Sequence, residues 1–288
     1  MRSVPRLLMR LRPGETGCLL PGRYRHRFPA KLSAARAKLI GLEGRARVDG
    51  AIWVTESARR AQVRGLDVTA SDRVFFIPLK VQANGVRIVG NRIHGSRSTT
   101  CVLIGSTRRA RGVVIERNWI HRCGRLGKLD HLIYVQDATG TLIRGNVLTD
   151  NPGGWAVHLY PNADRSLIER NLIDGNQGGV IFAGLARTTS DRNRVRSNVI
   201  TNSRPRWNVE GSWNDAVGVG NVVDGNCLFT TGLDAPTGIG DPVGFTAGPT
   251  LVRTTSPYSA RGHDAYRFPA GSECGGYVEP LSVVFPRR

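Results

Sequence analysis

Histidine and tyrosine side chains gather in two short apolar segments, and these residue types can donate and accept protons. The first segment reads Asp130-His131-Leu-Ile-Tyr134-Val, and the second reads His158-Leu-Tyr160-Pro. Because successive side chains of a β-strand point to opposite faces, strands here would bury the aliphatic residues and turn Tyr134, His158 and Tyr160 outward. We predict an exposed strip of these three side chains, with Tyr134 beside His158 on adjacent strands. Asp130 and His131 would flank its start.

This combination suits proton abstraction from a sugar acid. An imidazole or a deprotonated tyrosine could remove the C5 proton, which is α to the carboxylate of a uronate, and a second such group could protonate the leaving oxygen. A basic side chain would neutralise the carboxylate. The candidate catalytic residues are His131, Tyr134, His158 and Tyr160, and the candidate substrate-binding residues, on and after the loop before the first segment, are Arg122, Arg125, Lys128 and Asp130.

A structural role for the same residues is the alternative. Aromatic residues are common on half-exposed strands, where stacking between neighbours stabilises the sheet. The next apolar segment would place Val180 and Phe182 inside and Ile181 and Ala183 outside. Two further histidines, at positions 94 and 121, occupy a slot that holds threonine or aspartate elsewhere, so a polar side chain suffices there.

A repeated phrase indicates which elements position these side chains. An aliphatic residue precedes a central asparagine by three positions and another follows it by two, at intervals of 27, 28, 25, 27 and 23 residues. The copies are Ile88-Val-Gly-Asn91-Arg-Ile93, Ile115-Glu-Arg-Asn118-Trp-Ile120, Ile143-Arg-Gly-Asn146-Val-Leu148, Ile168-Glu-Arg-Asn171-Leu-Ile173 and Val195-Arg-Ser-Asn198-Val-Ile200, with a degenerate sixth copy at Asn221. A fixed period of this length indicates stacked units that bury a common hydrophobic face.

Each unit predicts short strands rather than helices, because β-branched residues dominate and glycine or asparagine recurs every few positions. Stacked units form parallel sheets in which equivalent residues lie about 4.8 Å apart, so the central asparagines would form a ladder of side-chain amides. A second set of asparagines follows shortly after the first and suits turns; its members are Asn151, Asn176, Asn202 and Asn226.

These repeats resemble the right-handed parallel β-helix proteins of the pectin-lyase-like superfamily. The similarity runs from about Gly14 to Gly232, includes a further rung at Val63-Arg-Gly-Leu66-Asp-Val68, and begins with a strand that ends in Pro21-Gly-Arg-Tyr24. It implies an all-β chain with a single right-handed parallel β-helix. We expect an N-terminal strand and cap in residues 1–38, helical or amphipathic near residues 30–38, coils in residues 39–230, and an irregular capping segment in residues 231–288.

The resemblance also implies action on an acidic, uronate-containing polysaccharide by lyase- or epimerase-type chemistry. The paired-aspartate signature of polygalacturonase-like hydrolases and the arginine motif of pectate lyases are missing, apart from the fragment Arg204-Pro-Arg206. A non-catalytic carbohydrate-binding or cell-surface structural protein therefore stays open. No cofactor is expected; calcium would require the aspartates to converge after folding, namely Asp130, Asp137, Asp150 and Asp164.

The charge balance favours an acidic partner. Lys and Arg number 41 against 22 Asp and Glu, which gives a formal net charge of +19. Arginine pairs bidentately with carboxylates and sulfates, although the arginine excess could also reflect genomic codon composition. Nucleic acid is not expected because no basic run is interleaved with aromatics. No apolar run is long enough to span a membrane. We expect a monomer.

The five cysteines are too widely spaced for a zinc knuckle, so no metal site is predicted. By analogy with extracellular relatives, Cys101 with Cys123 and Cys227 with Cys274 are plausible disulfides, which would leave Cys18 unpaired. The first ten residues lack the apolar core of a signal peptide. Secretion or a cell-surface location is what the resemblance implies.

Overall fold

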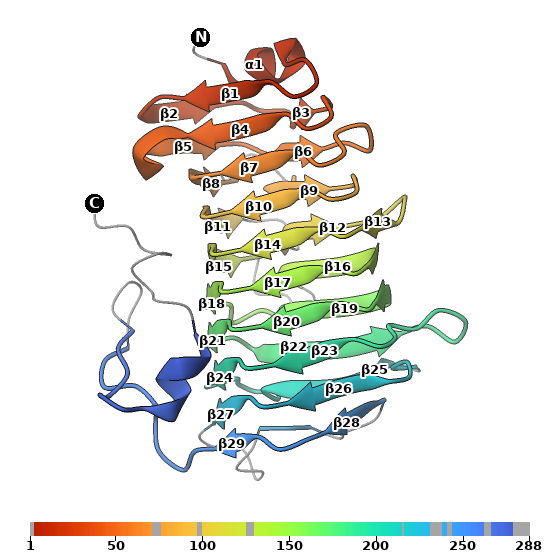
Figure 1. Cartoon of the computed structure of the whole chain (residues 1–288), viewed down its shortest axis with the longest axis vertical. Helices are drawn as coiled ribbons and strands as arrows, with labels where there is room; N and C mark the ends of the chain where they lie inside the picture. The colour runs from red at the N-terminus through yellow and green to blue at the C-terminus, as the bar shows by residue number, and fades with distance from the viewer. Residues whose placement is uncertain are drawn as a thin grey trace.

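The computed structural model describes residues 3–70, 76–96, 100–124, 130–214, 216–230, 238–240, 244–261 and 266–278. They form three parallel sheets, of ten, ten and nine strands, stacked along one long axis (Figure 1). The chain passes from sheet A to sheet B to sheet C and returns to sheet A one rung further on. The predicted all-β parallel solenoid is therefore confirmed.

Sheet A comprises β1 (Thr16–Leu19), β4 (Lys38–Gly41), β7 (Gln62–Arg64), β10 (Arg87–Val89), β14 (Val114–Glu116), β17 (Leu142–Arg144), β20 (Leu167–Glu169), β23 (Arg194–Arg196), β26 (Asn221–Asp224) and β28 (Phe245–Ala247). Sheet B comprises β2 (Gly22–Arg25), β5 (Ala46–Asp49), β8 (Leu66–Thr69), β11 (Arg92–Ser96), β15 (Trp119–Cys123), β18 (Val147–Thr149), β21 (Leu172–Asp174), β24 (Val199–Thr201), β27 (Cys227–Phe229) and β29 (Leu251–Val252). Sheet C comprises β3 (Ala30–Leu32), β6 (Ile52–Val54), β9 (Leu79–Val81), β12 (Thr100–Ile104), β16 (His131–Thr139), β19 (Trp155–Asp164), β22 (Gly178–Gly184) and β25 (Val209–Asn214), with β13 (Ala110–Arg111) paired to β16. A short 3₁₀ turn, η1 (Leu42–Gly44), joins β4 to β5, and a second, η2 (Glu273–Tyr277), lies in the C-terminal segment.

The N-terminal end of the stack is closed by helix α1 (Val4–Arg10). The Ser3 side chain caps this helix, and Val4 and Leu8 point into the core. The helical cap predicted near residues 30–38 is wrong, because Ala30 and Leu32 alternate with an exposed lysine and form strand β3. The division of the chain at residues 38 and 230 stays a prediction. Strands β28 and β29 pair with the coil sheets beyond residue 230.

The core is built from columns of aliphatic side chains in register. In sheet A, Ile88, Ile115, Ile143, Ile168 and Val195 pair in sequence across five rungs, and none is exposed to solvent. The aliphatic position of the repeat is therefore one continuous interior column. Because each rung contacts only its neighbours, burial of this column holds the stack together rung by rung.

The corner between sheets A and B explains the central asparagine. The residue before each ladder asparagine has a left-handed backbone. It is glycine in some rungs, and Arg117 (φ 54°), Arg170 (φ 55°) and Ser197 (φ 52°) in three others. The asparagine Oδ1 accepts the backbone N–H of the equivalent residue one rung earlier, as in Asn118 N–H to Asn146 Oδ1 at 2.9 Å. The predicted ladder is confirmed, and it starts where the Leu66 N–H donates to Asn91 Oδ1.

The degenerate sixth copy at Asn221 is wrong as a ladder position. Asn198 N–H donates to Asn226 Oδ1 at 3.0 Å, so Asn226 continues the ladder and preserves the interval at 28 residues. Asn221 belongs to a second ladder, in which it accepts the N–H of Asn193 at 2.9 Å. The preceding rung carries the same two positions, Asn193 and Asn198, because Arg194 of β23 pairs with Val222 of β26.

The C-terminal segment folds back on the outer face of sheet B (Figure 1). Tyr258, Tyr266 and Phe268 pack over Trp119 and its neighbours in that sheet. A disulfide joins Cys227 of β27 to Cys274, and a second joins Cys101 of β12 to Cys123 of β15, so both predicted pairings are confirmed. Cys18 is exposed and free.

The buried carboxylate of Asp174 fixes this segment further. It accepts hydrogen bonds from Arg261 Nε at 2.5 Å and from the Tyr266 hydroxyl at 2.6 Å. Among the described residues, no helix has the length and apolar character needed to cross a membrane.

Candidate active site on the outer face of sheet C

One outward-facing column runs along sheet C and carries the predicted site. Strand pairing places its members on successive rungs, and we call it the outer column. Its members are Lys31, Trp53, Lys80, Leu103, Tyr134, His158, Ile181 and Glu210. Tyr134 lies beside His158, as predicted. The two rings stack with centroids 5.2 Å apart, and Tyr160 stacks on His158 from the same strand at 5.4 Å.

The prediction of an exposed strip is wrong for His158, and His131, predicted to flank the strip, is buried as well. His131 and His158 are only 2% and 3% exposed, whereas Tyr134 and Tyr160 are half-buried. The covering rings include Trp155, whose centroid lies 5.6 Å from each imidazole. The alternation of side chains along the strand placed His158 on the correct, outward face, but side chains from other positions cover it.

Burial also extends up the outer column beyond His158. Val180 and Phe182 lie in the core as predicted, but Ile181 and Ala183, predicted to be outside, are not exposed either. Ile181 lies in register between two buried side chains, those of His158 and Glu210, which leaves it enclosed. The accessible part of the column thus ends near Tyr134 and Tyr160.

The two histidines form a hydrogen-bonded pair. His158 Nδ1 lies 2.8 Å from His131 Nε2, and one proton between them makes this bond. The two outer nitrogens, His131 Nδ1 and His158 Nε2, are buried and have no partner among the described residues. Buried polar atoms are seldom left unpaired, because each costs about 1–3 kcal/mol.

Burial decides the protonation of this pair. It lowers the pKa of His131 to about 3, because the protonated form would be desolvated. Burial also holds the pKa of His158 well below its usual range, and the neighbouring His131 lowers that pKa further. Both imidazoles are therefore neutral at physiological pH. Burial, with a smaller contribution from Tyr160, raises the pKa of Tyr134, so its hydroxyl keeps its proton.

A buried ion pair supports the cluster from the next rungs. Glu210 of β25 accepts hydrogen bonds from the Trp155 indole and from Arg206, whose guanidinium lies 5.6 Å from the Trp155 ring. Burial raises the pKa of Glu210, and the bonds from Arg206 and Trp155 oppose that change. Sequence reasoning missed Glu210 and Trp155. The signal for Glu210 was available, since an acidic residue stands between glycine and valine in an outward strand position.

Of the predicted substrate-binding residues, the structure describes Asp130 and Arg122. Asp130 is buried, and its backbone carbonyl accepts Asn151 Nδ2 at 2.7 Å. Arg122 is exposed and has a left-handed backbone (φ 53°) near the end of β15. Arg125 and Lys128 lie outside the described residues.

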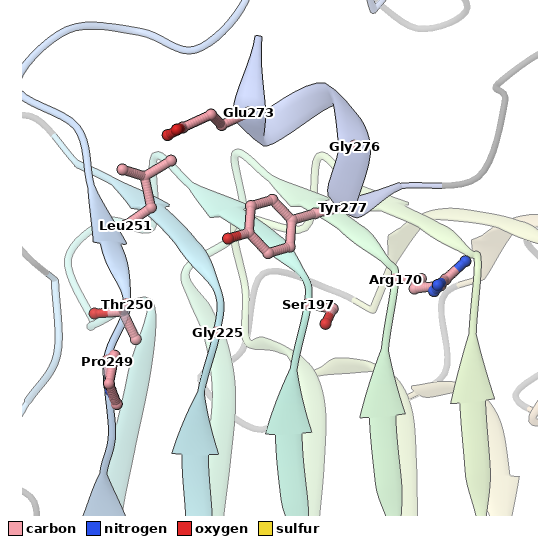
Figure 2. Close-up of a pocket in the computed structure, with 9 residues that line it drawn as sticks. All are labelled: Arg170, Ser197, Gly225, Pro249, Thr250, Leu251, Glu273, Gly276 and Tyr277. Carbon is pink, nitrogen blue, oxygen red and sulfur yellow. The ribbon is translucent and has the colours of Figure 1, made fainter.

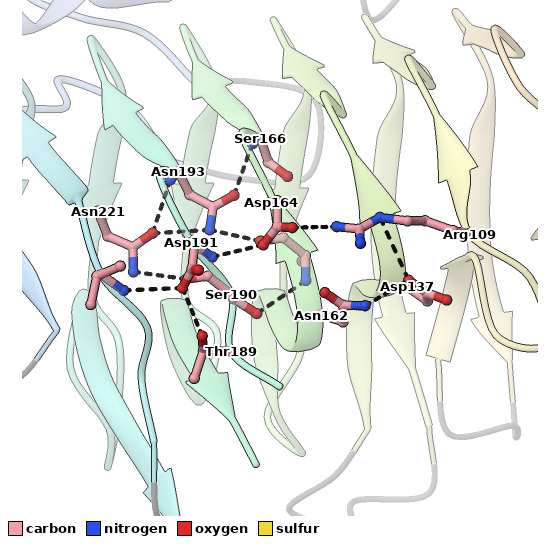
Figure 3. Close-up of polar contacts among 12 residues, drawn as sticks. Arg109, Asp137, Asn162, Asp164, Ser166, Thr189, Ser190, Asp191, Asn193 and Asn221 are labelled. Atoms are coloured by element: carbon pink, nitrogen blue, oxygen red, sulfur yellow. Dashed lines mark hydrogen bonds and ion pairs between the residues drawn. The ribbon is translucent and has the colours of Figure 1, made fainter. Parts of the chain in front are cut away.

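The aspartates considered for calcium have other partners. Arg109 forms ion pairs with both Asp137 and Asp164, while Asp191 N–H donates to Asp164 at 3.0 Å (Figure 3). A guanidinium already neutralises these two carboxylates, so their arrangement serves to join successive rungs. In the described part of the chain, no group of three or more His, Cys, Asp or Glu side chains is arranged to hold a metal ion.

A cavity of about 750 Å³ lies elsewhere, between η2 and the corner of sheets A and B (Figure 2). Arg170 and Ser197 line it from the corner, and Glu273 and Tyr277 line it from η2. None of the predicted site residues that the structure describes lines it. We favour the outer face of sheet C as the site, because the paired imidazoles and tyrosines converge there.

Comparison with solved structures finds the same fold in a pectate lyase, an alginate lyase and a tailspike protein. Pectate lyase Pel9A has a TM-score of 0.58 at 13% identity, over 93% of this chain and 84% of that one. The alginate lyase AlyF-OU02 in complex with G6 has a TM-score of 0.57 at 13% identity, over 85% and 60%. The Dettilon tailspike protein has a TM-score of 0.55 at 16% identity, over 82% and 57%.

This chain spans about three fifths of the tailspike and of that alginate lyase. Likeness at such identities concerns the fold alone. No curated protein matches the sequence. A family model described as the right handed beta helix region matches residues 79–240, which is more than half of the chain. The protein therefore belongs to the right-handed β-helix family.

Proposed function

We propose that this protein acts on an acidic, uronate-containing polysaccharide at the outer face of sheet C, by lyase- or epimerase-type proton abstraction. The observation that carries the proposal is the buried His131–His158 pair between the half-buried rings of Tyr134 and Tyr160. Its two outer nitrogens have no partner in the described part of the chain. The polysaccharide lyases among the structures of the same fold are in keeping with it.

In this mechanism His158 is the base. Its Nε2 accepts the C5 proton of the uronate when Nδ1 donates to His131 Nε2, and the depressed pKa of His158 keeps that nitrogen unprotonated beforehand. The added charge can be shared with His131 through the hydrogen bond between the rings. Because His158 is buried, the ring of Tyr134 or Tyr160 must move aside as the sugar enters.

The two reaction types differ in where the proton goes next. In elimination the C4–O bond breaks, a C4=C5 double bond forms, and a tyrosine hydroxyl protonates the leaving oxygen. In epimerisation a tyrosine hydroxyl gives C5 a proton on the opposite face, and no glycosidic bond breaks. Arg122, Arg125 and Lys128 remain the proposed cations for the uronate carboxylate, and the net charge of +19 favours capture of the polymer.

The test is a panel of polygalacturonate, alginate, chondroitin sulfate and heparin, with and without calcium. Ultraviolet absorbance detects the unsaturated product of elimination, and deuterium incorporation at C5 detects epimerisation. We expect His158→Gln and Tyr134→Phe to lower the rate at least about 100-fold, the usual contribution of one acid–base group. His94→Gln is the matched control, because His94 bonds Asp67 on sheet B, away from the site. No activity on any substrate, or activity that survives in His158→Gln, would contradict the proposal.

Binding without turnover is the second candidate, and the same pKa shifts favour it. An imidazole whose pKa is lowered to about 3 is a weak base, and a tyrosine whose pKa is raised is a weak acid. Half-exposed aromatic rings can hold sugars with no chemistry. Saturable binding of a polyuronate with neither product formation nor C5 exchange would support this candidate.

We further propose that the protein is secreted or held at the cell surface as a monomer. The disulfides Cys101–Cys123 and Cys227–Cys274 suit an oxidising compartment. Fractionation of the producing cells and light scattering of the purified protein test the two parts.

A further inference from the structure

The N-terminal end of the outer column carries positive charge. Strand pairing places Lys31, Trp53 and Lys80 on three successive rungs of β3, β6 and β9. Lys31 is exposed, and Trp53 and Lys80 are half-buried. The Lys80 ammonium lies 5.3 Å from the centroid of the Trp53 ring, and Phe76 packs its edge against that ring at 5.8 Å. The indole is thus held in a fixed position between two lysines.

Neither lysine forms an ion pair with a described residue. Within the described residues, no Asp or Glu lies within ion-pair distance of Lys31 or Lys80. The outer face of sheet A is different: the Glu116 carboxylate accepts Arg87 at 2.8 Å and Arg144 at 2.7 Å. The chain has only four lysines, so a genomic preference for arginine does not account for two of them on this column.

A hydrogen-bond donor also lacks an acceptor here. The indole N–H of Trp53 is buried and has no partner among the described residues. An unpaired buried donor costs about 1–3 kcal/mol. The Lys80 ammonium beside the indole is itself a donor, so it cannot accept the indole hydrogen bond. An anionic oxygen would satisfy the indole N–H and the ammonium of Lys80 together. The neighbouring Lys80 ammonium favours an anionic acceptor over a neutral one.

We propose that Lys31, Trp53 and Lys80 form a subsite for an anionic sugar, several units along the chain from the sugar that contacts Tyr134 and His158. The inference rests on the proposed function, because it assigns the polysaccharide its direction along the solenoid axis. Rungs are about 4.8 Å apart, so the three rungs from Trp53 to Tyr134 span about 14 Å. Only an oligosaccharide of several sugars reaches both ends.

The experiment measures dissociation constants by calorimetry for galacturonate oligomers, a disaccharide and an octasaccharide, in the His158→Gln background so that no turnover interferes. We expect Lys31→Gln/Lys80→Gln to weaken octasaccharide binding about 10-fold, which corresponds to about 1.4 kcal/mol for the two ion pairs together. Trp53→Phe keeps the ring and removes the N–H, and it should weaken binding about three-fold or more. Disaccharide binding should change less than about two-fold in both variants.

Lys38→Gln is the control, because Lys38 is an exposed lysine on sheet A. A heparin octasaccharide in the same assay distinguishes a sulfate from a carboxylate as the preferred anion. Equal affinities of Lys31→Gln/Lys80→Gln and Lys38→Gln for the octasaccharides, or no binding of either one, would overturn the subsite. Lysine-dependent binding with no turnover in the wild-type protein would uphold the subsite while removing the proposed catalysis.

Discussion

Replacement of Asn171 by leucine tests the asparagine ladder most directly. Asn171 is fully buried, and its Oδ1 accepts the backbone N–H of Asn146 at 2.9 Å and the Asn146 side-chain amide at 3.0 Å. Its Nδ2 donates to the Ile143 carbonyl at 2.9 Å and to Asn198 Oδ1 at 2.9 Å. Leucine has a similar size and provides neither function. The Asn146 N–H and the Ile143 carbonyl would each lose the asparagine as a partner.

Each unpaired buried group costs about 1–3 kcal/mol, so we expect a loss of about 3 kcal/mol in the free energy of unfolding. At roughly 2–4 °C per kcal/mol, the thermal midpoint should fall by about 6–12 °C. Calorimetry measures the midpoint, and hydrogen exchange locates the damage, which should concentrate on the rungs of Asn146 and Asn198 because coils couple to their neighbours.

Asn162→Leu is the control for this change. Asn162 is half-buried on sheet C and donates one bond, to Asp137 Oδ1 at 3.1 Å, so its loss should cost less than about 1 kcal/mol. A midpoint for Asn171→Leu that equals the control, with the Asn146 amide still protected, would refute the argument that ladder amides satisfy corner backbone.

Two further predictions concern acid and reduction. The folded pKa of His131 is about 3, below its unfolded value of 6.5, so its contribution to stability is complete above pH 6.5 and declines as the pH falls towards 3. The free energy of unfolding should fall by about 1.4 kcal/mol per pH unit for each of His131 and His158. Thermal midpoints measured between pH 7 and 5 should therefore vary less in His131→Gln/His158→Gln than in the wild-type protein. An equal slope in both proteins would contradict neutral burial. Cys227→Ser/Cys274→Ser opens a loop of 47 residues and should lower the free energy of unfolding by about 4 kcal/mol. The C-terminal segment should then become accessible to proteases, whereas Cys18→Ser should change neither stability nor digestion. Unchanged resistance to digestion in the double variant would show that packing alone holds the segment.

The repeat was readable from sequence because its signal is local. An aliphatic residue before asparagine marks one corner, and the interval between corners sets the rung, so the alignment of Tyr134 with His158 followed from strand alternation. Burial of His158 was not readable in the same way. Trp155 precedes it on the same strand, but Glu210 and Arg206 come from a rung about fifty residues later, and no local pattern states how these side chains pack.

The sixth ladder position shows a related limit. Asn221 and Asn226 stand five residues apart, and either could continue the series by type alone. The hydrogen bond from the Asn198 N–H, which only the folded structure reveals, selects Asn226 at an interval of 28 residues. The cap failed for a different reason: the alanines after Leu32 suggest a helix, but buried Ala30 and Leu32 complete the core of the first coil instead.

The repeated corner has a consequence for how such a chain can evolve. A left-handed residue followed by a ladder asparagine recurs at the passages from sheet A to sheet B between Asn91 and Asn226, so one of these corners can replace another without new contacts. Deletion of residues 146–170, for example, would join Gly145 to Asn171 and restore a left-handed glycine before an asparagine. Gene segments that begin and end at this dipeptide are therefore interchangeable parts. Protein length can grow or shrink in whole coils, while the chemistry carried by the wide strands of sheet C is gained or lost one coil at a time.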